Sequence, residues 1–155
     1  MVVSEEASTA ATRPPRNVTV TWDSSEHRFE AVGSHPGRTI TLNAPHSEDV
    51  AATGFSPAEL VLAGAGSCAA WDVVQILTKA RQDLRDLEVQ VVGTQQAEQP
   101  WPFRHIRLHY VVSGRGLKAG LVRRAVRLSH ERYCSAIATI RGAAEVEFTI
   151  EIRET

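Results

Sequence analysis

The sequence has little cysteine, no block of like charge and no long apolar run. Lys and Arg number 17 against 18 Asp and Glu, so the net charge is −1, and a nucleic-acid partner is not expected. No uninterrupted apolar run approaches the roughly 18 residues of a membrane span. The first residues hold acids where a signal peptide has lysines. We therefore expect a cytoplasmic protein with no membrane partner.

Only two cysteines occur, Cys68 and Cys134. Two thiols fall short of a four-ligand zinc site unless histidines join them, and no ligand spacing supports such a site, so no metal is expected. Cytoplasmic thiols are kept reduced, which makes a disulfide there transient and catalytic rather than structural. The pair can do chemistry only if the fold brings the two segments together.

The chain has 155 residues, of which 43% are apolar and 23% charged, as expected for one globular domain with its own core. Residues 1–15 are small, polar and proline-containing and predict a flexible N-terminal tail. Residues 16–155 are predicted to form a single domain.

Short alternating runs at 17–22, 28–32 and 39–43 predict an antiparallel meander, and 45–54 predicts a loop. A long helix is predicted from Ser56, the N-cap, through Leu77, with Pro57 at the first helical position and Glu59 completing a capping box. Its centre is rich in Ala and Gly, which suggests that another backbone packs very close.

Strand patterns follow at 87–95 and 104–112, helical patterns at 117–130 and 134–140, and a last strand at 145–152. This order predicts an α+β fold in which mainly antiparallel strands pack on a long central helix accompanied by shorter helices. A six-turn apolar helix is hard to cover within one small domain, so we expect a homodimer with this helix at its centre.

The segments around the two cysteines resemble a known family. Residues 54–77, around Cys68, are similar to the first-cysteine helix of the OsmC/Ohr (osmotically inducible / organic hydroperoxide resistance) family. Residues 131–139, around Cys134, are similar to its second-cysteine segment, and 113–117 to the turn before the preceding helix. The similarity covers roughly residues 17–152, and the contexts of both cysteines resemble the OsmC-like branch more than the Ohr branch.

The resemblance implies an OsmC-like fold, an intertwined homodimer and thiol-dependent reduction of small-molecule hydroperoxides. In that family the first cysteine attacks the peroxide, and the second resolves the sulfenic acid as a disulfide. These roles would fall to Cys68 and Cys134. No bound cofactor is implied, and an external dithiol reductant, lipoyl-linked in some members, would restore the thiols.

The resemblance also implies an arginine near the first cysteine, paired with a glutamate. Arg28 and Arg38 are the candidates, with Arg28 slightly favoured. Glu59 is the glutamate candidate, although Ala58 fills the place directly after the proline where the Ohr branch has its glutamate. One residue rotates a side chain by about 100° around a helix, so Glu59 is either catalytic or only part of the capping box.

Trp71 and Gly64 flank Cys68 on its helix, and Tyr133 precedes Cys134. We expect these three residues to line a substrate pocket, with core packing as the other interpretation of Trp71. Asp72, one helical turn after Cys68, would as a bare carboxylate raise the pKa of the thiol, and we expect it instead to pair with an arginine across the dimer interface. The alternative to a peroxidase is a non-catalytic OsmC-like dimer that binds a small apolar or sulfur-containing ligand.

Overall fold

The computed structural model describes residues 12–35, 37–43 and 52–155. Most of the predicted tail and most of the predicted loop at 45–54 lie outside the described residues. The chain divides into two compact units, Met1–Ser56 and Pro57–Thr155.

The first unit contains a three-stranded antiparallel sheet in the order β1-β2-β3, which confirms the predicted meander. A tight turn follows β1, where Asp23 Oδ1 accepts a hydrogen bond from the backbone N–H of Ser25 at 2.9 Å. Phe55 N donates to Thr41 O at 3.1 Å and joins the end of this unit to its third strand. The strands are β1 (Thr19–Asp23), β2 (Arg28–Val32) and β3 (Thr39–Leu42).

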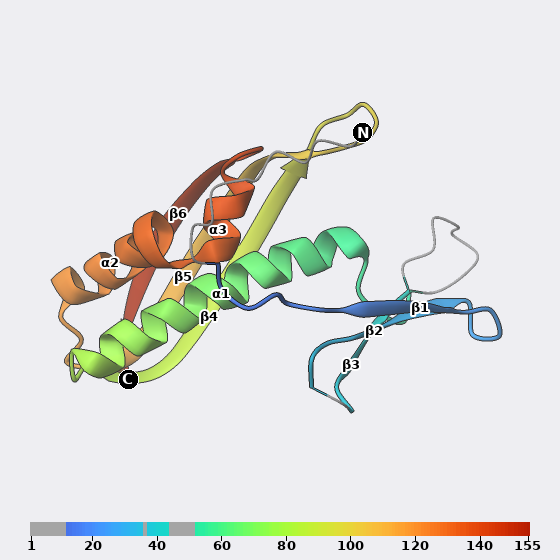
Figure 1. Ribbon diagram of the computed structural model, residues 1–155. Coiled ribbons are helices and arrows are strands. Elements are labelled where there is room, and N and C mark those ends of the chain that lie inside the picture. The colour runs from blue at the N-terminus through green and yellow to red at the C-terminus, as the bar shows by residue number, and fades with distance from the viewer. Residues whose placement is uncertain (1–11, 36, 44–51) are drawn as a thin grey trace, which may run out of the picture. The chain divides into compact units, whose positions relative to one another are not determined.

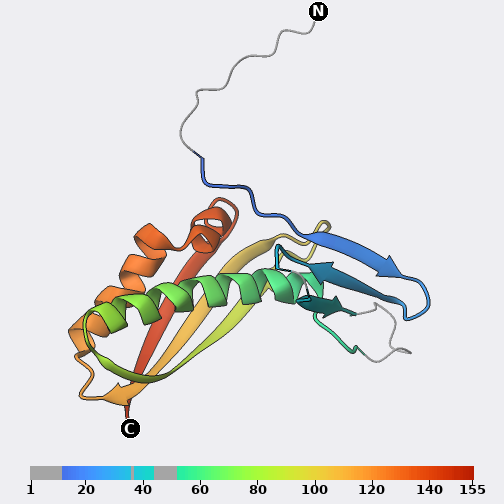
Figure 2. The ribbon, with the colours of Figure 1, turned by 60° about the horizontal axis from the view of Figure 1, so that its bottom comes forward.

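In the second unit, one long helix and three shorter helical segments pack against a three-stranded sheet (Figure 1). Figure 2 shows that the helices cover one face of this sheet. The elements are α1 (Pro57–Lys79), β4 (Asp83–Gln95), β5 (Phe103–Arg115), α2 (Ala119–Leu128), the π-helical turn η1 (Ser129–Tyr133), α3 (Ser135–Ile140) and β6 (Glu145–Glu154).

The α+β class is confirmed, and the order of elements follows the sequence prediction with two differences. The predicted helix over 117–130 ends earlier and passes into η1, which the pattern did not indicate. The second difference is that β6 pairs parallel to β5 rather than antiparallel. The bounds also differ, since β4 begins earlier, and β5 and β6 end later, than predicted. A parallel neighbour needs a crossover connection, and α2, η1 and α3 together supply it.

The core of this unit lies between α1, the shorter helices and the sheet. On β5 Ile106, Leu108 and Tyr110 share one face by strand alternation, and all three are fully buried. They pack in one cluster with the inner stripe of α1, which consists of Ala65, Ala69, Val73 and Leu77. A spacing of four residues puts these four side chains on one face of the helix.

The small residues of α1 have two different surroundings. A Cβ on Gly66 would lie 2.8 Å from Cγ2 of Val91 on β4, so this glycine permits the close approach of helix and sheet. A Cβ on Gly64 would meet nothing within 4 Å among the described residues. The close neighbour at Gly66 is thus a side chain, and not the second backbone that the sequence led us to expect.

The outer face of α1 is exposed although it is apolar. Trp71 is 67% exposed, and Val61 and Val74 are also exposed. By length and composition α1 could cross a membrane, a property that it shares with the core helices of many soluble proteins. An exposed apolar face of this kind indicates that another molecule packs against it.

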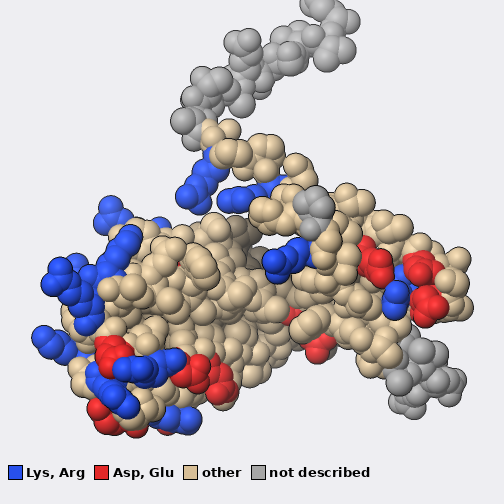
Figure 3. Space-filling view, turned by 90° about the horizontal axis from the view of Figure 1, so that it is seen from below, with Lys and Arg blue, Asp and Glu red and all other residues tan. Residues whose placement is uncertain are grey.

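Helix α2 is strongly amphipathic. Val122, Ala125 and Val126 are buried, whereas Arg123 and Arg127 on its other side are exposed. Positive side chains accordingly gather along one edge of the surface in Figure 3. The amphipathic pattern fixes which side of α2 faces the core and therefore how the chain enters η1.

Candidate active site

The fold brings the two cysteines into contact. Cys68 lies in the middle of α1, and Cys134 lies between η1 and α3, 66 positions later. Both are free thiols, and each shifts the pKa of the other. Two sulfur atoms in this relation are placed for thiol–disulfide chemistry.

The π-helical turn places Cys134. Its backbone N–H donates to Ser129 O at 2.9 Å and closes η1, after which Cys134 itself is extended, with φ −74° and ψ 106°. Its Sγ then accepts a hydrogen bond from the backbone N–H of Ile137 at 3.4 Å, so the thiol caps α3. Single π-helical turns often occur at functional sites. Here the turn directs a buried sulfur toward α1.

Cys68 is half-buried and is surrounded by hydrogen-bond donors. Its Sγ lies 3.9 Å from Oγ of Ser135, the first residue of α3. Burial raises the pKa of Cys68, but hydrogen bonds from the Cys134 side chain, the backbone of Ala136 and the Ser135 side chain bring the pKa below its ordinary value. The nearby charge of Asp72 acts against this, as expected from its position one turn later.

The pKa of Cys134 is shifted in the opposite direction. Burial is the main cause that raises its pKa to about 12, and the hydrogen bond with Cys68 raises it further, against the N–H of Ile137. When the pair loses one proton, the negative charge therefore rests on Cys68, while Cys134 keeps its hydrogen and donates it. Of the two thiols, Cys68 is thus the one whose surroundings favour the thiolate.

The Asp72 carboxylate is held by a residue of η1. The hydroxyl of the fully buried Ser129 lies 3.0 Å from Asp72 Oδ2 and 3.1 Å from the backbone oxygen of Ala69. Both acceptors belong to α1, so this single hydroxyl ties the π-helical turn to the helix that holds Cys68. The contact fixes the distance between the two cysteine segments.

A buried Tyr–His pair lies behind the cysteines. The hydroxyl oxygen of Tyr110 lies 2.8 Å from Nε2 of His130, and the His130 backbone oxygen accepts a hydrogen bond from Arg141 Nη1 at 2.9 Å. Burial, followed by the charge of Arg141, lowers the pKa of His130 to about 4, so its ring is neutral at pH 7. Burial, followed by the charge of Cys134, raises the pKa of Tyr110. Tyr110 and His130 are therefore both uncharged at pH 7.

The residues predicted to supply a cation lie in the first unit. Arg28 on β2 donates from Nη2 to Glu30 Oε1 at 3.0 Å, and Arg38 is exposed just before β3. Glu59 is exposed in the first turn of α1. The participation of Arg28, Arg38 or Glu59 at Cys68 stays a prediction.

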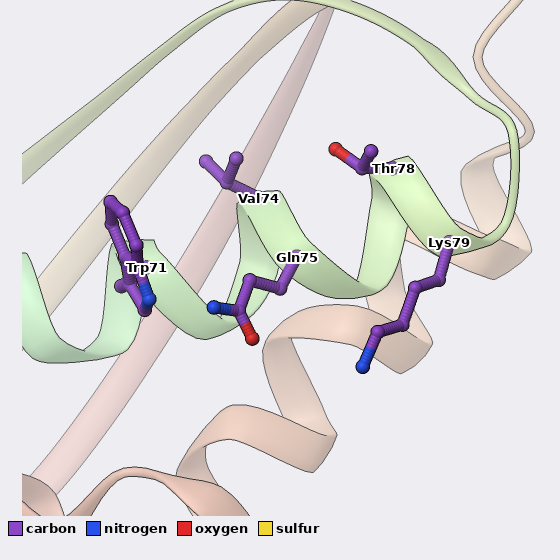
Figure 4. Close-up of a pocket in the computed structure, with 5 residues that line it drawn as sticks. All are labelled: Trp71, Val74, Gln75, Thr78 and Lys79. Atoms are coloured by element: carbon purple, nitrogen blue, oxygen red, sulfur yellow. The ribbon is translucent and has the colours of Figure 1, made fainter.

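The predicted pocket residues are all exposed in the chain. Trp71 lines a groove of about 220 Å³ along the outer face of α1, together with Val74, Gln75, Thr78 and Lys79 (Figure 4). Gly64 and Tyr133 do not line this groove, although both are exposed. Within the single chain Trp71 does not pack in the core, because it is 67% exposed. A substrate pocket formed by Trp71, Gly64 and Tyr133 stays a prediction.

Sequence reasoning missed three of the residues that shape the site. These are Ser129, Ser135 and Tyr110, which contact Asp72, Cys68 and His130 respectively. Ser135 could have been identified from the sequence, because it directly follows Cys134 at the start of a predicted helix. The other two contacts join residues that are 20 or more positions apart, and no local sequence pattern indicates them.

Comparison with known proteins agrees with this geometry. The model of the OsmC-like protein family matches residues 48–149, a range that includes both cysteines and every element from α1 to α3. The chain belongs to the OsmC-like family. The sequence resemblance is thereby confirmed.

Individual OsmC-like relatives extend the comparison. The chain is 46% identical over 97 residues to protein YhfA of Escherichia coli K12, which covers 63% of this chain and 72% of YhfA. A hypothetical protein from Aquifex aeolicus has a crystal structure that is 26% identical, with a TM-score of 0.80 over 92% of this chain and 99% of that one. An organic hydroperoxide resistance protein from Elizabethkingia anophelis is 15% identical, with a TM-score of 0.69 over 92% and 99%.

Proposed function

We propose that this OsmC-like protein is a cytoplasmic thiol peroxidase that reduces organic hydroperoxides in defence against oxidative stress. The observation that supports it most is the asymmetric pair, with a low-pKa Cys68 in contact with a protonated, buried Cys134. A peroxidase of this kind needs one thiolate and one thiol in reach of it. The fold shared with an organic hydroperoxide resistance protein is consistent with this role.

The proposed reaction has two steps. The Cys68 thiolate attacks one oxygen of the hydroperoxide, the O–O bond breaks, and the alkoxide leaves as an alcohol after taking up a proton, so that Cys68 becomes a sulfenic acid. Cys134 then attacks the Cys68 sulfur, and hydroxide leaves as water with the Cys134 proton. The product is a Cys68–Cys134 disulfide. An external dithiol, lipoyl-linked or free, reduces it and becomes a disulfide in turn.

Other residues complete the proposal. Arg28, or in its place Arg38, would stabilise the Cys68 thiolate, with Glu59 as its partner. Trp71, Gly64 and Tyr133 would contact the organic part of the substrate. No bound cofactor is needed in this scheme, because the electrons come from the external dithiol.

The experiment is a titration of free thiols before and after one equivalent of cumene hydroperoxide. We expect rapid loss of two thiols per chain in the wild type and no rapid loss in Cys68→Ser. In Cys134→Ser the reaction should stop at a sulfenic acid that dimedone traps on Cys68. Wild-type thiols that stay reduced for hours would exclude the peroxidase.

The groove beside Trp71 favours a second candidate function, a non-catalytic dimer that binds a small apolar or sulfur-containing ligand. The groove is lined by the apolar surfaces of Trp71 and Val74 with few polar groups. Quenching of tryptophan fluorescence by such a ligand, unchanged in Cys68→Ser and lost in Trp71→Ala, would support this function in a protein whose thiols do not react with hydroperoxide.

We further propose that a second copy of the chain covers the outer face of α1. The exposed apolar residues on this helix, Val61, Trp71 and Val74, form a face of the kind that homodimers bury. Sedimentation equilibrium should give twice the mass of one chain, and Val61→Glu combined with Val74→Glu should reduce it to one. A monomeric wild type at micromolar concentration would contradict the dimer.

A further inference from the structure

Ser135 is the side chain of α3 that reaches the sulfur of Cys68. Its Oγ lies 3.9 Å from Cys68 Sγ, and the two residues are 67 positions apart in sequence. The position of Ser135 follows from the turn before it, because Cys134 directs its own sulfur into the core and the next residue starts α3. The backbone oxygen of Ser135 accepts a hydrogen bond from Thr139 Oγ1 at 2.8 Å, which supports this first turn.

We propose that Ser135 is a catalytic residue of this site, whose hydroxyl donates a hydrogen bond to the Cys68 sulfur and stabilises it as a thiolate. The direction of this hydrogen bond depends on the protonation state of Cys68. While Cys68 is a thiol, either atom can be the donor. A thiolate has no hydrogen and can only accept, so deprotonation of Cys68 commits the Ser135 hydroxyl to donate.

The charges around Cys68 give this donor its importance. The titratable groups that act on the site from the packed elements of the second unit are Asp72 on α1, Cys134 before α3 and Tyr110 on β5. Each of the three is neutral or negative, so none of them attracts the thiolate as a cation would. The groups that lower the pKa of Cys68 are hydrogen-bond donors, and Ser135 is the hydroxyl among them.

The other two donors are not interchangeable with Ser135. Cys134 loses its hydrogen when the proposed disulfide forms, and the backbone N–H of Ala136 cannot be removed by a side-chain substitution. Ser135 keeps its hydroxyl hydrogen throughout the reaction proposed above. A role of Ser135 in turnover therefore rests on that proposed function. Because Ser135 is exposed, its hydroxyl can be deleted without opening a cavity in the core.

The test measures the rate of iodoacetamide reaction at Cys68 in the full-length protein from pH 5 to pH 10, with mass spectrometry to identify the modified residue. Ser135→Ala should slow the reaction by about threefold to tenfold near pH 7, which corresponds to the loss of one hydrogen bond. The rates should converge near pH 10, where both proteins hold the thiolate. Ser135→Thr keeps a hydroxyl and should restore the wild-type profile.

Ser67→Ala is the matched control. Ser67 is adjacent to Cys68, but its hydroxyl donates to Ala63 O at 2.7 Å and not to the sulfur. Its removal should leave the pH profile of Cys68 unchanged. A Ser135→Ala profile identical to the wild type would overturn the inference, and so would an equal shift in Ser67→Ala.

The outcome is distinguishable from that of the proposed function. If Ser135→Ala shifts the alkylation profile while cumene hydroperoxide leaves the wild-type thiols reduced, the role of Ser135 toward the thiolate stands and the peroxidase fails. If the wild type forms its disulfide with hydroperoxide and the Ser135→Ala profile does not shift, the peroxidase stands and the role of Ser135 fails.

Discussion

Cys68 and Cys134 touch each other, yet their surroundings differ in almost every respect. Cys68 is half-buried in the middle of a long helix, whereas Cys134 is 3% exposed at the start of a short one. The pKa of Cys68 is lowered by the donors around it, and the pKa of Cys134 is raised to about 12, chiefly by burial. Two identical side chains thus acquire distinct chemical roles from their neighbours alone.

The difference shows which physical effect prevails at each sulfur. Burial raises the pKa of both thiols, because a thiolate loses water when it leaves the solvent. At Cys68 three donors outweigh this effect. At Cys134 the N–H of Ile137 is too little to do so, since the sulfur also donates to Cys68. The difference between the two thiols has measurable consequences.

The largest expected effect is on the rate of alkylation at pH 7. Cys68 should react with iodoacetamide at least about a hundredfold faster than Cys134, because alkylation requires thiolate and Cys134 is both protonated and buried. Peptide mapping after short exposure measures the two rates in one sample. Cys68→Ser should remove the fast reaction, and Cys134→Ser, which keeps a donor, should retain it. Equal rates at the two cysteines would show that the two thiols do not differ in reactivity.

The second-largest effect is on the free energy of unfolding, through the buried ring of His130. The pKa of His130 is about 4 in the folded protein and ordinarily about 6.5. Above pH 6.5 the ring is neutral in both states, and as the pH falls below 6.5 only the unfolded chain binds a proton. The free energy of unfolding should therefore decrease by about 2 kcal/mol between pH 7 and pH 5.

Urea denaturation at both pH values measures this decrease. His130→Gln should reduce it strongly, whereas His35→Asn, at an exposed position, should leave it unchanged. An equal decrease in His130→Gln and the wild type would mean that His130 is not held neutral by the fold.

The smallest effect is that of Asp72 on Cys68. The Asp72 carboxylate raises the pKa of the Cys68 thiol, so Asp72→Asn should speed alkylation of Cys68 at pH 7 by about threefold. Asparagine keeps an oxygen that accepts from Ser129 and is the same size. Asp86→Asn, on the exposed face of β4, serves as the control for loss of one negative charge. A slower reaction in Asp72→Asn would show that the carboxylate assists Cys68 instead.

Much of the fold could be predicted because most of its elements have a local signal. The Ser56–Pro57 start and the apolar run define α1, and the alternation at Ile106, Leu108 and Tyr110 defines the inner face of β5. The turn η1 had no such signal, since its residues fit an ordinary helix equally well. The parallel pairing of β6 depends on where the crossover returns the chain, and alternation along a strand does not encode direction.

The candidate site was predictable only where its residues are unusual in type. Two cysteines in one chain are conspicuous, and the surrounding residues resemble those of the OsmC family. Ser129 and Ser135 are common residues, and their contacts with Asp72 and Cys68 exist only after the chain has folded. The arginine and glutamate expected near Cys68 stay predictions.

Residue type and spacing along the chain are enough to give the family, the order of helices and strands, the apolar faces and the presence of two thiols. The difference in pKa between the two thiols arises only in the folded chain. That difference depends on burial and on donors from segments more than 60 positions away from Cys68, and the strength of a hydrogen bond or of desolvation is set by distance in space and not by distance in sequence.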